Sequence, residues 1–119
     1  MDRMNEAKRM HERAMQLLNE ALFVRQQGEA EMSASLRMDA FRLERAAAES
    51  LLERFDLEPT RSILFKGAAV LALQVNLGRE AERLARLGLA GDPPEYVAAE
   101  LWTTLERAGL YLHGGAGRP

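Results

Sequence analysis

Two histidines, His11 and His113, are the side chains of this sequence whose charge changes close to neutral pH. His11 follows Lys8 by three residues, so the Glu-x-x-His spacing by which helical bundles bind paired iron ions is absent there. The chain has no cysteine, which excludes a thiolate nucleophile and any zinc site built on cysteine. No glycine-rich phosphate loop or Ser-His-Asp set can be recognised. We therefore expect no metal, no cofactor and no catalytic residue, and a buried or boundary position for His11.

The second histidine closes the segment Arg107-Ala108-Gly109-Leu110-Tyr111-Leu112-His113. This segment is similar to the Arg-x(4–6)-His motif of HEPN-type helical ribonucleases. The resemblance implies that Arg107 and His113 contact a phosphate and assist attack by a 2′-hydroxyl. Two features depart from the motif: Ala108 stands where a polar residue is usual, and Gly109 is expected to end the helix between the two residues. We predict that the chain is not an enzyme, with this ribonuclease as the alternative.

The charges are balanced and interleaved along the chain. Sixteen basic and eighteen acidic residues give a net charge of −2. Proteins that bind nucleic acids usually carry a basic excess or a basic stripe, so we expect no nucleic-acid partner. No apolar run approaches the ~20 residues of a membrane span, and the charged N-terminus lacks the apolar segment of a signal peptide. We expect a cytoplasmic protein with no membrane partner.

The composition and the spacing of apolar residues predict an all-α fold. Leu, Ala, Glu and Arg dominate, whereas there are four valines and one isoleucine from which to build strands. Apolar residues at helical spacing predict a long hairpin over 3–55, with a tight turn at Gly28. Its two amphipathic helices must lie antiparallel, since only that arrangement buries both apolar stripes.

Three shorter helices are predicted after the hairpin. A second hairpin over 59–91 begins at Pro59, turns at 76–78 and ends at Gly91. A fifth helix over 93–108 begins after an N-cap at Asp92 and ends at Gly109. The sequence thus predicts about five helices in one domain over 1–109. A C-terminal tail over 110–119 follows, which we expect to be disordered towards its end.

The second hairpin carries small residues on the facing sides of its helices. Phe65 is the one bulky residue among Ala68, Ala69 and Ala72 in one helix and Ala81, Ala85 and Gly88 in the next. With the closing Asp92-Pro93, this pattern resembles one tetratricopeptide repeat, and residues 58–106 resemble tetratricopeptide-like elements of uncharacterised bacterial proteins. Ala72 and Ala85 stand where that family usually has larger residues. The resemblance implies stacked helix pairs, a capping helix over 93–108, and a concave surface that binds proteins or peptides.

The predicted concave surface lies on the exposed side of the helix that begins at Pro59. Its candidate partner-binding residues are Ile63, Lys66, Val70, Leu73 and Gln74. Because only Lys66 is basic, capture of a C-terminal carboxylate is not favoured, and an apolar peptide or helix fits better. The alternative is that the first helix or a second subunit already covers this face.

The length of the first hairpin predicts a homodimer. Helices of ~25 residues extend roughly 37 Å, whereas the helices of the second hairpin cover only ~18–26 Å. We expect parts of the apolar stripes over 4–14 and 43–55 to project beyond the rest of the domain, where a second copy can cover them. The alternative is that the fifth helix or residues 110–112 fold back over the stripe.

Overall fold

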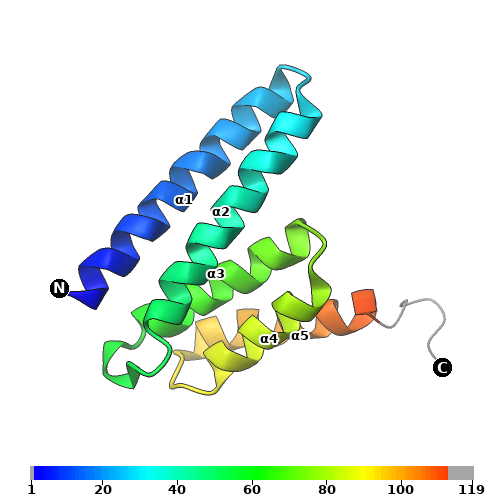
Figure 1. Ribbon diagram of the computed structural model, residues 1–119. Coiled ribbons are helices and arrows are strands. Elements are labelled where there is room, and N and C mark those ends of the chain that lie inside the picture. Colours follow the sequence, from blue (N-terminus) through cyan, green and yellow to red (C-terminus); the bar gives the residue numbers. More distant parts are fainter. Residues whose placement is uncertain (1, 113–119) are drawn as a thin grey trace.

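The computed structural model describes residues 2–112, which form five α-helices and one 3₁₀ turn with no strand among them (Figure 1). The elements in chain order are α1 (Arg3–Gln26), α2 (Ala30–Ser50), η1 (Phe55–Leu57), α3 (Thr60–Gln74), α4 (Gly78–Leu89) and α5 (Glu95–Leu112). Neighbouring helices pack as antiparallel pairs, α1 with α2, α3 with α4, and α4 with α5. The all-α prediction is confirmed.

The first hairpin begins and turns at residues suited to those positions. The side chain of Asp2 accepts a hydrogen bond from the Met4 amide at 2.9 Å and so caps α1. At the turn, Gly28 has a φ of 86°, a left-handed conformation that other residues adopt only with strain. The Glu29 amide donates to the carbonyl of Val24 at 2.9 Å and closes the end of the helix. A glycine is therefore needed where the sequence places one.

The second helix ends earlier than predicted. Periodicity predicted a helix to Phe55, but α2 ends at Ser50 and a turn leads into η1. The carbonyl of Leu52 accepts a hydrogen bond from Arg61 Nε at 2.9 Å, and the Phe55 ring lies 4.5 Å from the guanidinium carbon of Arg61. These contacts with α3 hold the chain in a turn, so tertiary structure ends the helix before its apolar pattern does.

The fifth helix is displaced towards the C-terminus. It begins at Glu95, three residues after the predicted N-cap Asp92, and it continues through Gly109 to Leu112. Gly109 was predicted to end it, which is wrong: glycine ends a helix where it turns left-handed, and Gly109 is not among the residues with positive φ. The fully buried Ala108 beside it holds this last turn on the core. The rest of the predicted tail lies outside the described residues.

The main core lies around α3. Ala68, Ala69 and Ala72 of α3 are fully buried, as are Ala81 and Ala85 of α4. A side chain added at Gly88 would bring its Cβ within 3.1 Å of the Cβ of Phe65 and 2.9 Å of a methyl group of Leu101. Small residues on α3 and α4 thus allow a close approach of the helices, as their spacing predicts.

Two loops meet at one end of this core. Glu58 accepts hydrogen bonds from the Ser62 amide at the start of α3 and from the Asp92 amide before α5, each at 2.9 Å. The buried guanidinium of Arg61 stacks between the rings of Phe55 and Phe65, and any side chain at Gly91 would collide with Glu58 and Arg61. The segments 58–62 and 88–94, distant in sequence, therefore form one structural junction.

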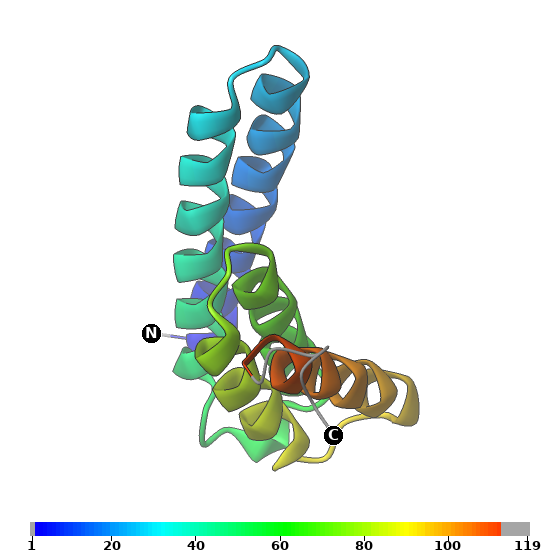
Figure 2. The same ribbon diagram turned by 90° about the vertical axis from the view of Figure 1, so that its right-hand side faces the viewer.

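The molecule is angled, and the turn end of the first hairpin projects beyond the other helices (Figures 1 and 2). The other end of the hairpin is in the core, where Ala7, Ala47 and Leu51 are fully buried. A projecting hairpin was predicted, but at the wrong end. The short connection after α2 keeps α3 beside the C-terminal end of that helix, so most of the apolar residues in the predicted stripes over 4–14 and 43–55 pack on the core and the turn end is left free. Leu52 and Phe55, at the end of the second stripe, are exposed.

Exposed apolar side chains mark this projecting part, which we call the overhanging end. It lies on either side of Gly28 and carries Leu22, Phe23 and Met32, whose exposed fractions are 56%, 61% and 50%. A small separate cluster around Ala14, Leu17 and Ala40 holds the two helices together below it. The overhanging end is a helical hairpin with its own packing and with apolar side chains left in solvent.

Candidate interaction surface

One exposed face of α3 lies between two hollows. Val70 and Gln74 are four residues apart and therefore share this face of the helix. Gln74 lines an open hollow of about 730 Å³ against the overhanging end, with Leu18, Ala21, Leu22, Arg25, Ala30, Ser33 and Arg37. Val70 lines another of about 260 Å³ against α5, with Ala99, Glu100, Thr103, Thr104 and Arg107. We call the two hollows and the α3 face between them the concave face.

The five residues predicted from the sequence to bind a partner have different surroundings. Val70 and Gln74 line the two hollows. Lys66 lies at the α5 side, with Nζ 3.6 Å from a carboxylate oxygen of Glu100. Ile63 and Leu73 are half-buried and pack against the main core. Of the five predicted residues, Val70 and Gln74 therefore line hollows in the surface, and the binding role of all five stays a prediction.

The sequence-based prediction omitted the contribution of the first hairpin. Leu22, Arg25 and Arg37 line the larger hollow, although none was a candidate. A signal was present in the sequence: Leu18, Ala21 and Arg25 are spaced by three and four residues, so an arginine ends an otherwise apolar stripe. A charged residue on the buried side of a helix indicates that this side opens to solvent or to a ligand.

Three arginines of the concave face have no carboxylate within ion-pairing distance in the part of the chain that the structure describes. They are Arg25, Arg37 and Arg107. The guanidinium of Arg37 donates to the hydroxyl of Ser33 at 3.3 Å, and this hydroxyl donates to the carbonyl of Ala21 at 2.8 Å. Ser33 is fully buried, so the bond anchors Arg37 at the wall of the larger hollow.

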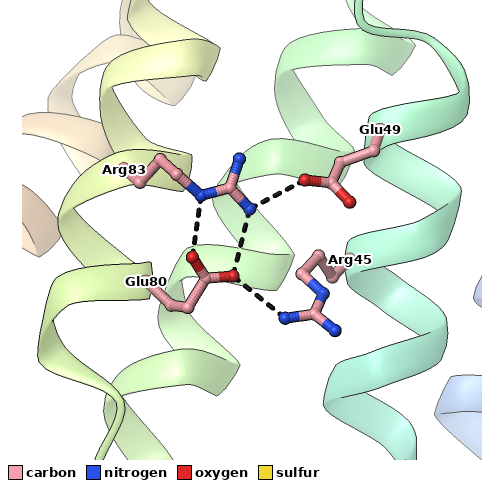
Figure 3. Close-up of polar contacts among 4 residues, drawn as sticks. All are labelled: Arg45, Glu49, Glu80 and Arg83. Atoms are coloured by element: carbon pink, nitrogen blue, oxygen red, sulfur yellow. Dashed lines mark hydrogen bonds and ion pairs between the residues drawn. The ribbon is translucent and has the colours of Figure 1, made fainter.

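Other arginines are paired with carboxylates between α2 and α4 (Figure 3). Glu80 accepts hydrogen bonds from Arg83 at 2.7 and 3.0 Å and from Arg45 at 3.0 Å, and Arg83 also donates to Glu49 at 2.7 Å. The hydrogen bonds from Arg83, and then the one from Arg45, lower the pKa of Glu80 to about 2. This network joins two helices of the fold and pairs both oxygens of Glu80 with arginines of the protein itself, so we regard it as structural.

A buried carboxylate lies between α1, α2 and α3. Glu44 is 1% exposed, and His11 Nδ1 lies 2.8 and 3.0 Å from its two oxygens. Burial raises the pKa of Glu44, and the hydrogen bond with His11 opposes this increase. No group of three or more His, Cys, Asp or Glu side chains within residues 2–112 is placed to hold a metal ion. The pair connects helices and has the character of a core contact.

The two residues of the ribonuclease-like motif are not both described. Arg107 lines the smaller hollow, while His113 lies outside the described residues. Because α5 continues through Gly109, the helix break that we expected between the two residues is absent. The replacement of a polar residue by the buried Ala108 remains as a departure from the motif.

Comparisons with known proteins identified no relative of this chain. No protein-family model matches it, and neither a curated protein nor a solved structure shows significant similarity. The tetratricopeptide resemblance therefore rests on the sequence pattern. Across residues 2–112, no helix has both the length and the apolar character that crossing a membrane requires.

Proposed function

We propose that this chain is a non-catalytic, tetratricopeptide-like interaction module that binds a protein or peptide segment on its concave face. The observation that carries the proposal is the pair of open hollows on either side of the exposed face of α3. Pockets of several hundred Å³ with apolar walls and a few polar groups are typical of binding sites. In the larger hollow, the apolar walls come from Leu18, Leu22 and Ala30. Apolar side chains presented in this way favour a peptide or helix as the occupant.

The arrangement of helices supports the tetratricopeptide-like part of the proposal. α3 and α4 pack through small residues, and α5 then packs on α4 as the next helix of the series. α3 and α5 both line the smaller hollow, to which α4 contributes no residue. A groove formed by alternate helices of a stack is the arrangement that the resemblance implies.

A selection experiment tests the proposed function. We expect a random peptide library displayed on phage to yield peptides that bind the full chain with micromolar affinity. A variant with a blocked concave face, Leu22→Glu/Val70→Glu, should lose this binding, while Tyr96→Glu/Trp102→Glu on the exposed side of α5 should retain it. Circular dichroism verifies that each variant is folded. The proposal fails if no peptide is enriched, or if the enriched peptides bind the blocked variant as tightly as the wild type.

The ribonuclease alternative is tested with structured RNA. We expect no cleavage by the purified chain. Cleavage that is lost in both Arg107→Ala and His113→Ala would replace the interaction module with an enzyme, because contamination by another nuclease would not depend on these residues.

We further propose that the module is a homodimer formed through the overhanging end. On the side away from the concave face, Phe23 and Met32 line a hollow of about 460 Å³, together with Asn19, Glu20, Val24 and Leu36. In a two-fold dimer, each copy presents the same surface to the other. The exposed Phe23 ring of one copy can then enter the apolar hollow of its partner, and the partner's ring can enter the first hollow. Two such hairpins would form a four-helix arrangement.

A further inference from the structure

The concave face and the whole chain carry charges of opposite sign. The chain has a net charge of −2. Three cationic residues, Arg25, Arg37 and Arg107, and one anionic residue, Glu100, line the two hollows, so the net charge of the lining is +2 (3 − 1). Glu100 is moreover within 3.6 Å of Lys66, which adds another cation at the same place. Clefts with one sign of charge and apolar walls concentrate ligands of the opposite sign.

The positive charge of this face is not neutralised by the protein itself. Arg25, Arg37 and Arg107 lack a carboxylate partner among residues 2–112, whereas Arg45 of α2 and Arg83 of α4 share Glu80. A guanidinium binds a carboxylate through two parallel hydrogen bonds, with more geometric specificity than a lysine. The bond to Ser33 already holds Arg37 at the wall of the hollow, so it loses less side-chain freedom when a ligand binds.

The walls of the same hollows distinguish a peptide from a nucleic acid. Leu18, Leu22 and Val70 present apolar surface that phosphates and sugars do not use. Proteins that bind single strands stack bases on aromatic side chains, and the residues lining these two hollows include no Phe, Tyr or Trp. The combination of apolar walls and free guanidinium groups matches carboxylates interspersed with apolar side chains.

We propose that the partner of the concave face is an acidic amphipathic segment, whose apolar side chains enter the hollows and whose carboxylates pair with Arg25, Arg37 and Arg107. This inference rests on the proposed function, and it adds the chemistry of the partner. Val70 and Gln74 are one helical turn apart, so a segment lying along α3 reaches both hollows. It then meets two arginines at one end and one at the other.

Fluorescence anisotropy with designed peptides tests this inference on the full chain. The probe is a labelled amphipathic peptide of leucine and glutamate. Its counterparts replace every glutamate with lysine, or every leucine with serine. We expect only the leucine–glutamate peptide to bind, with an affinity that falls as salt is added, because its ion pairs are partly screened.

Charge-reversal variants identify the residues that carry the binding. Arg25→Glu/Arg37→Glu should weaken binding of the leucine–glutamate peptide by about tenfold or more, since two charge-assisted contacts become repulsive. The matched control, Arg9→Glu/Arg79→Glu, makes the same change in net charge at exposed arginines away from the hollows and should leave the affinity unchanged. The neutral variant Arg25→Gln/Arg37→Gln should show an intermediate loss, and circular dichroism should show that all of these variants are folded.

Several results would overturn the inference. They are equal or tighter binding of the lysine peptide, equal binding of the serine–glutamate peptide, an equal loss in the control variant, and tighter binding of a single-stranded RNA that competes for the same arginines. If the phage selection instead yields peptides without acidic residues that still need Leu22 and Val70, the acidic partner is wrong and the interaction module stands. If neither experiment yields a peptide that depends on the concave face, the proposed function fails as well.

Discussion

Glu44 is one of two charged residues buried in the described part of the chain, and Arg61 is the other. Its carboxylate is 1% exposed, contacts His11 of α1 and lies against Gly67 of α3. A Cβ at position 67 would lie 2.6 Å from Glu44 Oε2, closer than atoms can approach. A buried carboxylate without a partner is costly, so the glycine on α3 and the histidine on α1 are both needed for this arrangement. At the scale of residues, the missing side chain of Gly67 leaves the space that the buried carboxylate of Glu44 occupies.

Two glycine substitutions test this account. Gly67→Ala should lower the free energy of unfolding by about 1–3 kcal/mol, because Glu44 must move away from His11 to make room. Gly109→Ala, also within a helix, should be neutral or raise it by up to about 1 kcal/mol, since its Cβ would meet nothing within 4 Å. Urea unfolding followed by circular dichroism measures both. Equal stabilisation by the two alanines would show that Glu44 is not held in place.

At the scale of elements, α2 and α4 are joined by charges that originate far apart in the sequence. Arg45 and Glu49 of α2 flank Arg83 and Glu80 of α4, and the four side chains form one network (Figure 3). The Glu80 side chain as a whole is 26% exposed. The network therefore links α4 to the first hairpin through side chains, and it makes that link dependent on pH.

The pH dependence has a definite sign. Since the pKa of Glu80 is lowered from 4.5 to about 2, the unfolded chain binds more protons than the folded chain between these values. Its contribution to stability is present above pH ~4.5 and is lost as the pH falls towards 2, by on the order of 1–2 kcal/mol after solvent screening. Glu80→Gln should reduce the loss of stability over this interval, in unfolding measured from pH 5 to pH 2. Glu82→Gln, on the same helix with a longer 3.8 Å ion pair to Arg86, serves as the control and should change little. An unchanged pH dependence in Glu80→Gln would contradict the assignment.

At the scale of the whole molecule, the overhanging end presents exposed apolar side chains on two different faces. Leu22 faces the larger hollow of the concave face, whereas Phe23 lines the hollow on the other side of the same hairpin. Adjacent residues of one helix thus serve the two proposed interfaces, one for a partner and one for a second copy. This separation allows both proposals to be tested with neighbouring substitutions.

The oligomeric state tests the second of these interfaces. We expect light scattering after gel filtration to give twice the 13.3 kDa of one chain at tens of micromolar. Phe23→Glu/Met32→Glu should yield the monomer, because two charges cannot be buried in an apolar interface. Leu22→Glu is the matched control, since it places a charge at an equally exposed leucine on the concave side and should leave the dimer intact. A wild-type mass near 13.3 kDa, or dissociation by Leu22→Glu, would exclude this dimer.

The sequence by itself determined the number and order of the helices, the turn at Gly28 and the small residues that bring α3 and α4 together, but not where the second and fifth helices end. Each of these depends on local geometry: which positions share a helix face, and where the backbone needs a glycine. It also selected the face of α3 that carries Val70 and Gln74. Only the tertiary structure decided which end of the first hairpin overhangs, because periodicity fixes the buried side of a helix but not how far a neighbour extends along it. Only the tertiary structure likewise showed that Arg25 and Arg37 have no carboxylate partner among the described residues. An arginine can be said to lack such a partner only when the positions of all the helices around it are known.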